Sequence, residues 1–436
     1  MRRVAVLSAV LALAACPSAA ARSFSWSVPE HLTGDGERSA AKTVEEAAHA
    51  PATAIELTRC GKGSTWSLDG DDRVEPVIEG RRCTLDLGDN DVHELALDGG
   101  QAIAVQARDL LIVSVGDSVA SGEGNPNHGG LFHGDWTDRR CHRSVRSGGA
   151  RAAADLEHSS PHSAVTFLPL GCSGATIAGV RGQVESLAAL RGVRQIDAVL
   201  LSAGANDVYF ADIAIFCARH PRCDGARFHP PDGAVPDGSA DDVVKAALGT
   251  LRTRYAALAA ALVDAGVEPA RVIVTEYFDP TRDEHGETCA HTLPGVDRAE
   301  AEWAQESIVG PLNVALRDAI GDTQWLLVGG VREAFETHGI CASPERNRWI
   351  VRIPDSLWEG AGFRGPLHPN RDGHRALSRM IEPVLAATVG STGVVPPEGD
   401  GGIHWPELLL GALAGALLGA LVTLVITRVV AGRQGR

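Results

Sequence analysis

Residues 111–118 of this 436-residue chain are Leu-Ile-Val-Ser-Val-Gly-Asp-Ser. The segment begins as an apolar run, which predicts a strand that is buried on both faces of a parallel sheet. The run stops at Gly116, so Ser118 is expected at the C-terminal end of the strand. In open α/β sheets this end of the strands faces the ligand crevice. Gly122 and Gly124 follow closely and would let the backbone approach a substrate.

Three further blocks with chemically useful side chains follow along the chain. They are Gly171-Cys172-Ser173-Gly174, Gly204-Ala205-Asn206-Asp207 and His368-Pro369-Asn370. The first two come directly after apolar segments, 164–169 and 197–202, that are expected to be strands. Ester hydrolysis by a serine needs a nucleophile, a base and hydrogen-bond donors for the oxyanion. An asparagine amide suits the donor role because it brings no competing charge.

In this order, the four blocks resemble the SGNH (GDSL-type) serine hydrolases, in particular the secreted actinobacterial lipases and esterases. The resemblance covers about residues 107–390 and implies hydrolysis of carboxylic esters through an acyl-enzyme, with no metal or organic cofactor. It implies that Ser118 is the nucleophile and His368 the general base. It also implies that Asn206 and the N–H of Gly174, with Gly171 as the alternative, bind the oxyanion. The absence of a Gly-x-Ser-x-Gly motif around Ser118 argues against the α/β-hydrolase fold.

One position departs from the family pattern. Many members place an aspartate three residues before the histidine, where this chain has Gly365. Some members orient the imidazole with a backbone carbonyl, which Gly365 or Pro366 would supply here. Asp355 and Asp372 are the nearby carboxylates that would otherwise serve. His374 falls inside the following predicted helix and is expected to be structural.

The order of predicted elements indicates an α/β fold with a flavodoxin-like parallel sheet. Strands are expected at 110–115, 164–169, 197–202, 271–276 and 325–329, and helices at 148–157, 177–191, 241–265, 297–320 and 371–388. Residues 208–240 are rich in proline and glycine and are expected to form a long loop. Short alternating segments with turn residues over 23–106 predict a small N-terminal β-sandwich domain before the hydrolase domain at 107–390.

Both ends of the chain carry patterns typical of export and anchoring. Residues 1–21 are expected to be a signal peptide, in which Cys16 is either the lipidated cysteine of a lipobox or a chance residue. A linker is expected at 391–406, a single transmembrane helix at 407–428 and a cytoplasmic tail at 429–436. This predicts a cell-membrane protein with an extracytoplasmic catalytic domain. Small residues at 411, 415 and 419 would permit a helix-mediated homodimer, and simple tolerance of glycine in a membrane helix is the alternative.

Nine cysteines are present, and setting Cys16 aside leaves eight, an even number that suits disulfides in an exported chain. Sequence cannot set their connectivity, but proximity to shared elements suggests four pairs. These are Cys60–Cys83, Cys141–Cys172, Cys217–Cys223 and Cys289–Cys341, of which the last three resemble the actinobacterial lipase pattern. The net charge of −15 argues against a nucleic-acid partner.

The expected partner is an ester substrate, either a lipid or an acylated glycan. An acyltransferase, in which a hydroxyl group replaces water, is an alternative activity. A catalytically degenerate surface binding module is the alternative outside enzymes. The presence of all four blocks argues against this last hypothesis.

Overall fold

A five-stranded parallel sheet forms the centre of the fold. The structure is a computed structural model that describes residues 24–32, 41, 43–48, 53–58, 60, 63–131 and 133–390. The strands lie in the order β10-β9-β11-β14-β17, which confirms the predicted flavodoxin-like sheet. Their bounds are β9 (Arg108–Gly116), β10 (Ser163–Pro169), β11 (Ala198–Ser202), β14 (Val272–Thr275) and β17 (Leu326–Val328).

Strand β9 is buried on both faces, as its apolar run predicts. Leu111 and Val113 belong to one hydrophobic cluster, whereas Leu110 and Ile112 belong to another. Successive side chains of a strand point to opposite faces, so a central parallel strand needs apolar residues at every position.

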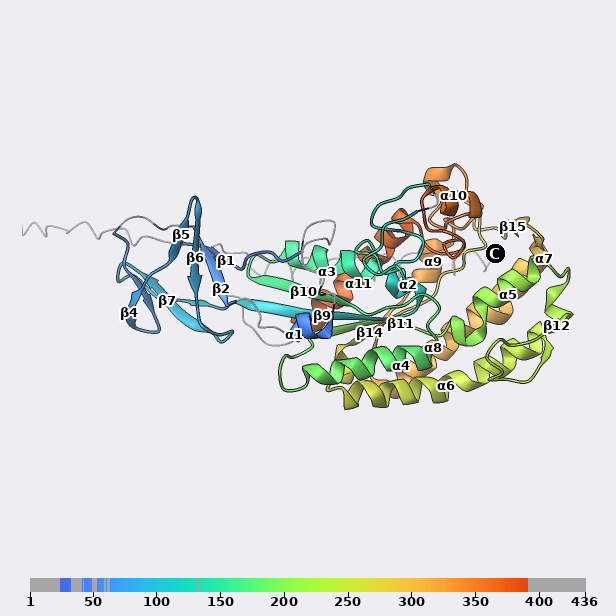
Figure 1. The fold of residues 1–436 in the computed structure, drawn as a ribbon, viewed down its shortest axis with the longest axis horizontal. Coiled ribbons are helices and arrows are strands. Elements are labelled where there is room, and N and C mark those ends of the chain that lie inside the picture. Colours follow the sequence, from blue (N-terminus) through green and yellow to red (C-terminus); the bar gives the residue numbers. More distant parts are fainter. Residues whose placement is uncertain are drawn as a thin grey trace, which may run out of the picture. The chain divides into compact units, whose positions relative to one another are not determined.

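Helices cover both faces of this sheet (Figure 1). Side chains of α4, α6 and α8 pack in one cluster, and those of α3 and α11 pack in the other. The helices are α1 (Val44–Ala48), α2 (Ser118–Ser121), α3 (Gly148–Ser159), α4 (Ile177–Ser186), α5 (Phe210–Cys217), α6 (Ala240–Asp264), α7 (Arg298–Ala304), α8 (Gly310–Thr323), α9 (Val331–Phe335), α10 (Ile353–Trp358) and α11 (Arg371–Gly390).

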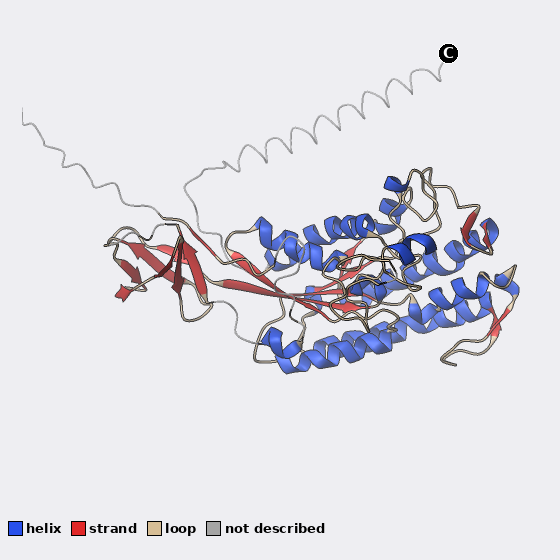
Figure 2. Cartoon of the chain, turned by 45° about the horizontal axis from the view of Figure 1, so that its top comes forward, coloured by secondary structure: helices blue, strands red, loops and turns tan. Residues whose placement is uncertain are grey.

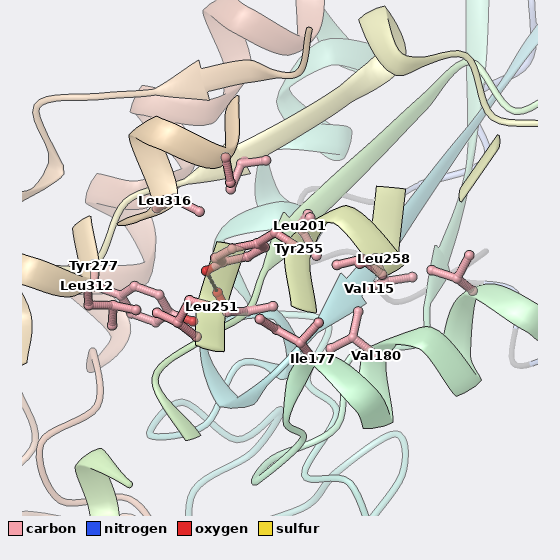
Figure 3. Close-up of a cluster of buried hydrophobic side chains, with 14 of the residues drawn as sticks. Val115, Ile177, Val180, Leu201, Leu251, Tyr255, Leu258, Tyr277, Leu312 and Leu316 are labelled. Atoms are coloured by element: carbon pink, nitrogen blue, oxygen red, sulfur yellow. Dashed lines mark hydrogen bonds between the residues drawn. The ribbon is translucent and has the colours of Figure 1, made fainter. Parts of the chain in front are cut away.

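The larger cluster joins α4, α6 and α8 to the sheet (Figure 3). Leu251, Tyr255 and Leu258 recur at helical spacing on α6, and each is fully buried. The Tyr255 hydroxyl donates a hydrogen bond of 2.6 Å to the carbonyl of Ala203, directly after β11. The apolar stripe of α6 therefore has a packing role.

The N-terminal residues form two four-stranded antiparallel sheets (Figure 2). One has the order β1-β2-β6-β5 and the other β4-β3-β7-β8. Side chains from both sheets, including Ile55, Leu85, Trp66 and Leu95, share one core, as in a β-sandwich. The strands are β1 (Trp26–Ser27), β2 (Ala54–Leu57), β3 (Trp66–Leu68), β4 (Asp71–Val74), β5 (Val77–Glu79), β6 (Arg82–Asp86), β7 (His93–Leu97) and β8 (Ile103–Val105).

Glu157, near the end of α3, links residues 31–32 to the α/β part. Its carboxylate accepts hydrogen bonds from the backbone N–H groups of His31 at 2.9 Å and Leu32 at 2.6 Å. It also accepts one from Val165 in β10 at 2.7 Å. The side chain is buried, so these three donors replace the water that a carboxylate would otherwise bind.

The segment 208–240 is more regular than expected. It contains α5 and a short hairpin of β12 (Arg227–Phe228) and β13 (Gly238–Ser239). The prediction of a long loop was wrong for residues 210–217, because the prolines and glycines that suggested it lie after the helix. The predicted helix at 297–320 is interrupted by a π-helical turn at Gln305–Val309 between α7 and α8. The remaining short elements are β15 (His291–Leu293), β16 (Val296–Asp297) and the 3₁₀ turns Leu187–Leu190, Asn206–Val208, Cys223–Gly225, Pro269–Arg271 and Glu345–Asn347.

Four disulfides join cysteines of the described residues. They are Cys60–Cys83, Cys141–Cys172, Cys217–Cys223 and Cys289–Cys341, the four pairs suggested by the sequence. The bridge from Cys141 to Cys172 ties the connection between α2 and α3 to the segment that follows β10.

The expectation of a membrane anchor is corrected. In the part of the chain that the structure describes, no helix is long and apolar enough to cross a membrane. The longest, α6, carries Asp241, Asp242 and Lys245 in its first turns. The fold class is therefore retained without a transmembrane helix, and the single-pass membrane location is not retained. The proposed signal peptide at 1–21, Cys16, the linker at 391–406, the helix at 407–428 with its dimer motif and the tail at 429–436 lie outside the described residues.

We expect Glu157→Gln to lower the free energy of unfolding by about 1–3 kcal/mol, because an amide nitrogen cannot accept and a buried N–H loses its partner. Chemical denaturation followed by circular dichroism measures this change. Glu185→Gln, on the exposed surface of α4, is the matched control and should have little effect. Equal stability of the two variants would contradict the role given to Glu157.

Candidate active site

Ser118 begins α2 immediately beyond the C-terminal end of β9. Asp117 caps this short helix, and its side chain accepts a hydrogen bond from the N–H of Val119 at 3.0 Å. Gly116 has φ = 142°, and a Cβ there would lie 2.1 Å from the carbonyl oxygen of Ser202. Glycine at this position therefore lets β9 turn tightly against the end of β11 and present Ser118.

The structure brings Ser118 and His368 into direct contact. Oγ of Ser118 lies 2.7 Å from Nε2 of His368, and Nδ1 of His368 lies 3.2 Å from the carbonyl oxygen of Pro366. A carbonyl can only accept, so Nδ1 carries the proton and Nε2 accepts from the serine hydroxyl. The Pro366 carbonyl thus selects the tautomer that a general base requires.

Neither aspartate considered from the sequence contacts His368. Asp355 binds the guanidinium of Arg352 through two contacts of 2.8 Å, and Asp372 binds Arg375 at 2.8 Å. Position 365 has no room for a carboxylate, because a Cβ there would lie 2.3 Å from Oγ of Ser356. A backbone carbonyl therefore takes the place of the usual third residue.

Two glycines follow β10, and their backbone N–H groups differ in availability. The N–H of Gly171 donates to the carbonyl of Ser114 at 3.1 Å. Gly174 has φ = 86° and is exposed, and within the described residues its N–H makes no hydrogen bond. The geometry therefore favours Gly174 over Gly171 as a donor to a substrate.

Asn206 follows β11 and points towards the same segment. Its Nδ2 donates to the carbonyl of Ala175 at 3.0 Å, which uses one of the two amide hydrogens. The neighbouring Asp207 is buried, where it accepts from the N–H of Ile177 at 2.8 Å and from Arg254 at 2.6 Å. Asp207 therefore joins the start of α4 to the loop after β11.

A buried polar network lies behind these residues. The hydroxyl of Tyr277 donates to Asp117 at 2.5 Å and accepts from the N–H of Ala205 at 3.3 Å. Asn313 holds Tyr277 in turn, through hydrogen bonds to both its backbone N–H and its carbonyl. The phenol thus connects the residue before Ser118 with the residue before Asn206.

Burial raises the pKa of Asp117 to about 6. Hydrogen bonds from Tyr277 and Val119 oppose this increase, because they stabilise the carboxylate. The charge of His368 acts in the same direction. Burial thus outweighs the hydrogen bonds and the charge of His368, and the pKa of Asp117 is raised overall.

Glu123 is a buried carboxylate that sequence analysis did not select. It accepts from His142 at 2.8 Å and from the hydroxyl of Ser173 at 2.7 Å. Burial raises its pKa, but these hydrogen bonds and the charges of His368 and His142 outweigh burial, so its pKa is lowered overall. Glu123 thereby holds Ser173, the neighbour of Gly174.

Arg143 also contacts the segment that follows β10. Its guanidinium donates to the carbonyls of Gly171 at 3.0 Å and Leu170 at 3.2 Å and lies 3.5 Å from Asp138.

Neither Glu123 nor Tyr277 belongs to a recognisable motif. The acidic residue among the glycines at 122–124 was the one available signal for Glu123.

His374 is fully buried in α11 and binds backbone groups through both ring nitrogens. Its Nε2 donates to the carbonyl of Glu123 at 3.0 Å, and its Nδ1 accepts from the N–H of Gly148 at 3.2 Å. Burial lowers its pKa to about 4. The structure therefore gives His374 the structural position that the sequence suggested.

We expect His374 to make the fold sensitive to acid. Between about pH 6.5 and pH 4 the unfolded chain binds a proton on this ring that the folded protein does not, so stability falls as pH falls. The loss should reach about 3 kcal/mol at pH 4. Denaturation of the wild type and of His374→Gln at several pH values in this range measures the loss. The difference between their free energies of unfolding near pH 8 is the baseline. If the free energies of unfolding of the two proteins change equally with pH, His374 makes no such contribution.

One family model matches the part of the chain that contains all four blocks. Residues 114–376 match the model of the GDSL-like lipase/acylhydrolase family. Among solved structures, the chain is similar to a phospholipase A1 from Streptomyces albidoflavus NA297, with 20% identity, 64% of this chain and 98% of that chain covered, and a TM-score of 0.45. It is also similar to an extracellular lipase from Streptomyces rimosus, with 20% identity, coverage of 64% and 99%, and a TM-score of 0.44. No curated protein matches the chain significantly. Because the family match spans more than half of the chain, this protein belongs to the GDSL-like lipase/acylhydrolase family and is a serine hydrolase that acts on ester bonds.

Proposed function

We propose that the protein hydrolyses carboxylic esters through an acyl-enzyme formed on Ser118. The observation that carries this proposal is the 2.7 Å contact between Oγ of Ser118 and Nε2 of His368, with the Pro366 carbonyl behind the imidazole. His368 takes the hydroxyl proton as the serine oxygen bonds to the ester carbonyl carbon. It returns that proton to the leaving alcohol as the ester C–O bond breaks. Water then repeats the sequence and releases the acid.

Three donors support the developing oxyanion in this proposal. They are the N–H of Ser118, the N–H of Gly174 and the second amide hydrogen of Asn206. These residues follow β9, β10 and β11, which are neighbours in the sheet, with β9 between the other two. Fixed donors stabilise the transition state because they need not reorient as charge develops.

We expect Ser118→Ala and His368→Ala each to lower kcat for p-nitrophenyl acetate by about 10⁴-fold or more. The double variant should be little worse than either single variant, because the two residues act as one unit. Rates of nitrophenol release, with circular dichroism as a check on folding, measure this. Water attack on the acyl group should give free acetate, whereas transfer to an added alcohol would indicate an acyltransferase.

Asp355→Asn is the matched control for the backbone-carbonyl arrangement. It should keep most of the activity, because Asp355 binds arginines rather than His368. A folded Asp355→Asn enzyme with a loss as large as that of Ser118→Ala would refute orientation by Pro366. A folded His368→Ala enzyme with a near-normal rate would refute the proposed base.

We expect Tyr277→Phe to lower kcat by about 10- to 100-fold with a smaller effect on KM, because the loops that carry Ser118 and Asn206 lose their shared hydroxyl. Tyr209→Phe is the control, since its hydroxyl donates to Asp232 instead. Steady-state kinetics on both variants tests the difference. Equal effects of the two substitutions would show that Tyr277 acts through general stability.

A further inference from the structure

The backbone around Glu123 contacts the segments that carry both the nucleophile and the base. The N–H of Glu123 donates to the carbonyl of Ser118 at 2.9 Å. The next residue, Gly124, has φ = 89°, and a Cβ there would lie 3.1 Å from Cβ of His368 and 2.5 Å from the carbonyl oxygen of Pro369. Glycine therefore lets the chain pass unusually close to the base.

The carboxylate of Glu123 is fully buried and only partly satisfied. Its Oε2 accepts hydrogen bonds from Nδ1 of His142 at 2.8 Å and from the hydroxyl of Ser173 at 2.7 Å. Its Oε1 is buried and has no hydrogen-bond partner among the described residues. Buried polar atoms of this kind are rare and destabilise the folded protein. Stability alone therefore does not account for a carboxylate at this position.

Glu123 keeps its negative charge in mildly acidic solution. Burial raises its pKa, but the hydrogen bond from His142 and the charge of His368 outweigh burial, so its pKa is lowered overall. Asp117 is also a buried carboxylate of the site, but burial raises its pKa to about 6. Asp117 therefore loses charge as the pH falls towards this value, whereas Glu123 does not.

Histidines from three segments surround Glu123. His142 lies between α2 and α3, His368 precedes α11, and His374 lies within α11, where it donates to the carbonyl of Glu123 at 3.0 Å. Burial lowers the pKa of His374 to about 4, and the charge of Arg151 on α3 acts in the same direction. Of these groups, His368 is the one that gains a proton in the proposed reaction.

We propose that Glu123 is a positioning residue whose negative charge stabilises the imidazolium of His368 after it takes the proton from Oγ of Ser118. The inference rests on the proposed function, because it uses His368 as the general base. The Pro366 carbonyl orients the ring but carries no net charge, so it cannot balance the imidazolium as a triad aspartate does. Opposite charges in a buried site interact strongly because little water screens them. Glu123 thus supplies the charge, and Pro366 the orientation.

Glu123→Gln tests the proposal, because an amide of the same shape removes the charge alone. Its carbonyl oxygen can still accept from His142 and Ser173, and its NH2 group replaces the oxygen that has no partner. We expect kcat for p-nitrophenyl acetate to fall about tenfold, with a smaller change in KM. The midpoint of the acidic limb of kcat/KM against pH should move about one unit lower, since the neutral side chain no longer favours the protonated imidazole. A tenfold loss matches one pH unit because both measure the same charge interaction.

Three further variants separate the charge from other effects. Ser173→Ala removes a hydrogen bond to Glu123 but keeps the charge, so it should leave the midpoint in place even where kcat falls through Gly174. Glu123→Asp also keeps the charge and should keep a midpoint near that of the wild type. Glu157→Gln is the matched control, since it makes the same substitution at a buried glutamate outside the site. It should keep both kcat and the midpoint, although it lowers stability.

An unchanged midpoint in a folded Glu123→Gln enzyme would overturn the inference, whatever its rate. An equal move of the midpoint in Ser173→Ala would also overturn it, because the hydroxyl contact would then account for the effect. Where Glu123→Gln does not fold, Glu123→Asp decides, and a midpoint about one unit lower in that variant would contradict the role of the charge. Normal ester hydrolysis by Ser118→Ala would instead reject the proposed function.

Discussion

The pairing of β9 with β10 on one side and β11 on the other is the constraint on which the candidate active site depends. Parallel pairing places the C-terminal ends of these three strands at one edge, with Gly116 opposite Ser202. The segments that carry Ser118, Gly174 and Asn206 all leave the sheet there. Their proximity follows from backbone hydrogen bonds, so little side-chain contact is needed to assemble the site.

Buried polar groups then limit how far these segments can move. Tyr277 links Asp117 to the N–H of Ala205, while Asp207 joins the loop after β11 to the start of α4. Glu123 and Arg143 both form hydrogen bonds with the segment between β10 and α4. A buried polar atom without a hydrogen-bond partner destabilises the folded protein, so each network favours one arrangement of the loops. The loops are thereby held in place before any substrate binds.

The sequence predicted secondary structure best in strands whose consecutive residues are all buried. The five parallel strands were predicted to within two residues at each end, because strands covered on both faces are continuous apolar runs. The helix α5 was missed, since the proline-rich residues after it dominated the interpretation of 208–240. Nearly all of its residues are apolar, so no polar face marked the helical period. The prediction of a membrane-spanning helix is not retained, as no described helix provides one.

The sequence by itself determined the fold class, the four blocks and the candidates Ser118, Gly174, Asn206 and His368. These signals are local, so a short run of residues carries each of them. The tertiary structure decided that Pro366 rather than a carboxylate orients His368, because that depends on a contact and on the lack of space at Gly365. It also decided the positions of Tyr277 and Glu123. Residues that meet across 160 positions of chain, as Asp117 and Tyr277 do, leave no mark in a single sequence. Their partnership arises when the strands and helices pack, and it follows from no short pattern.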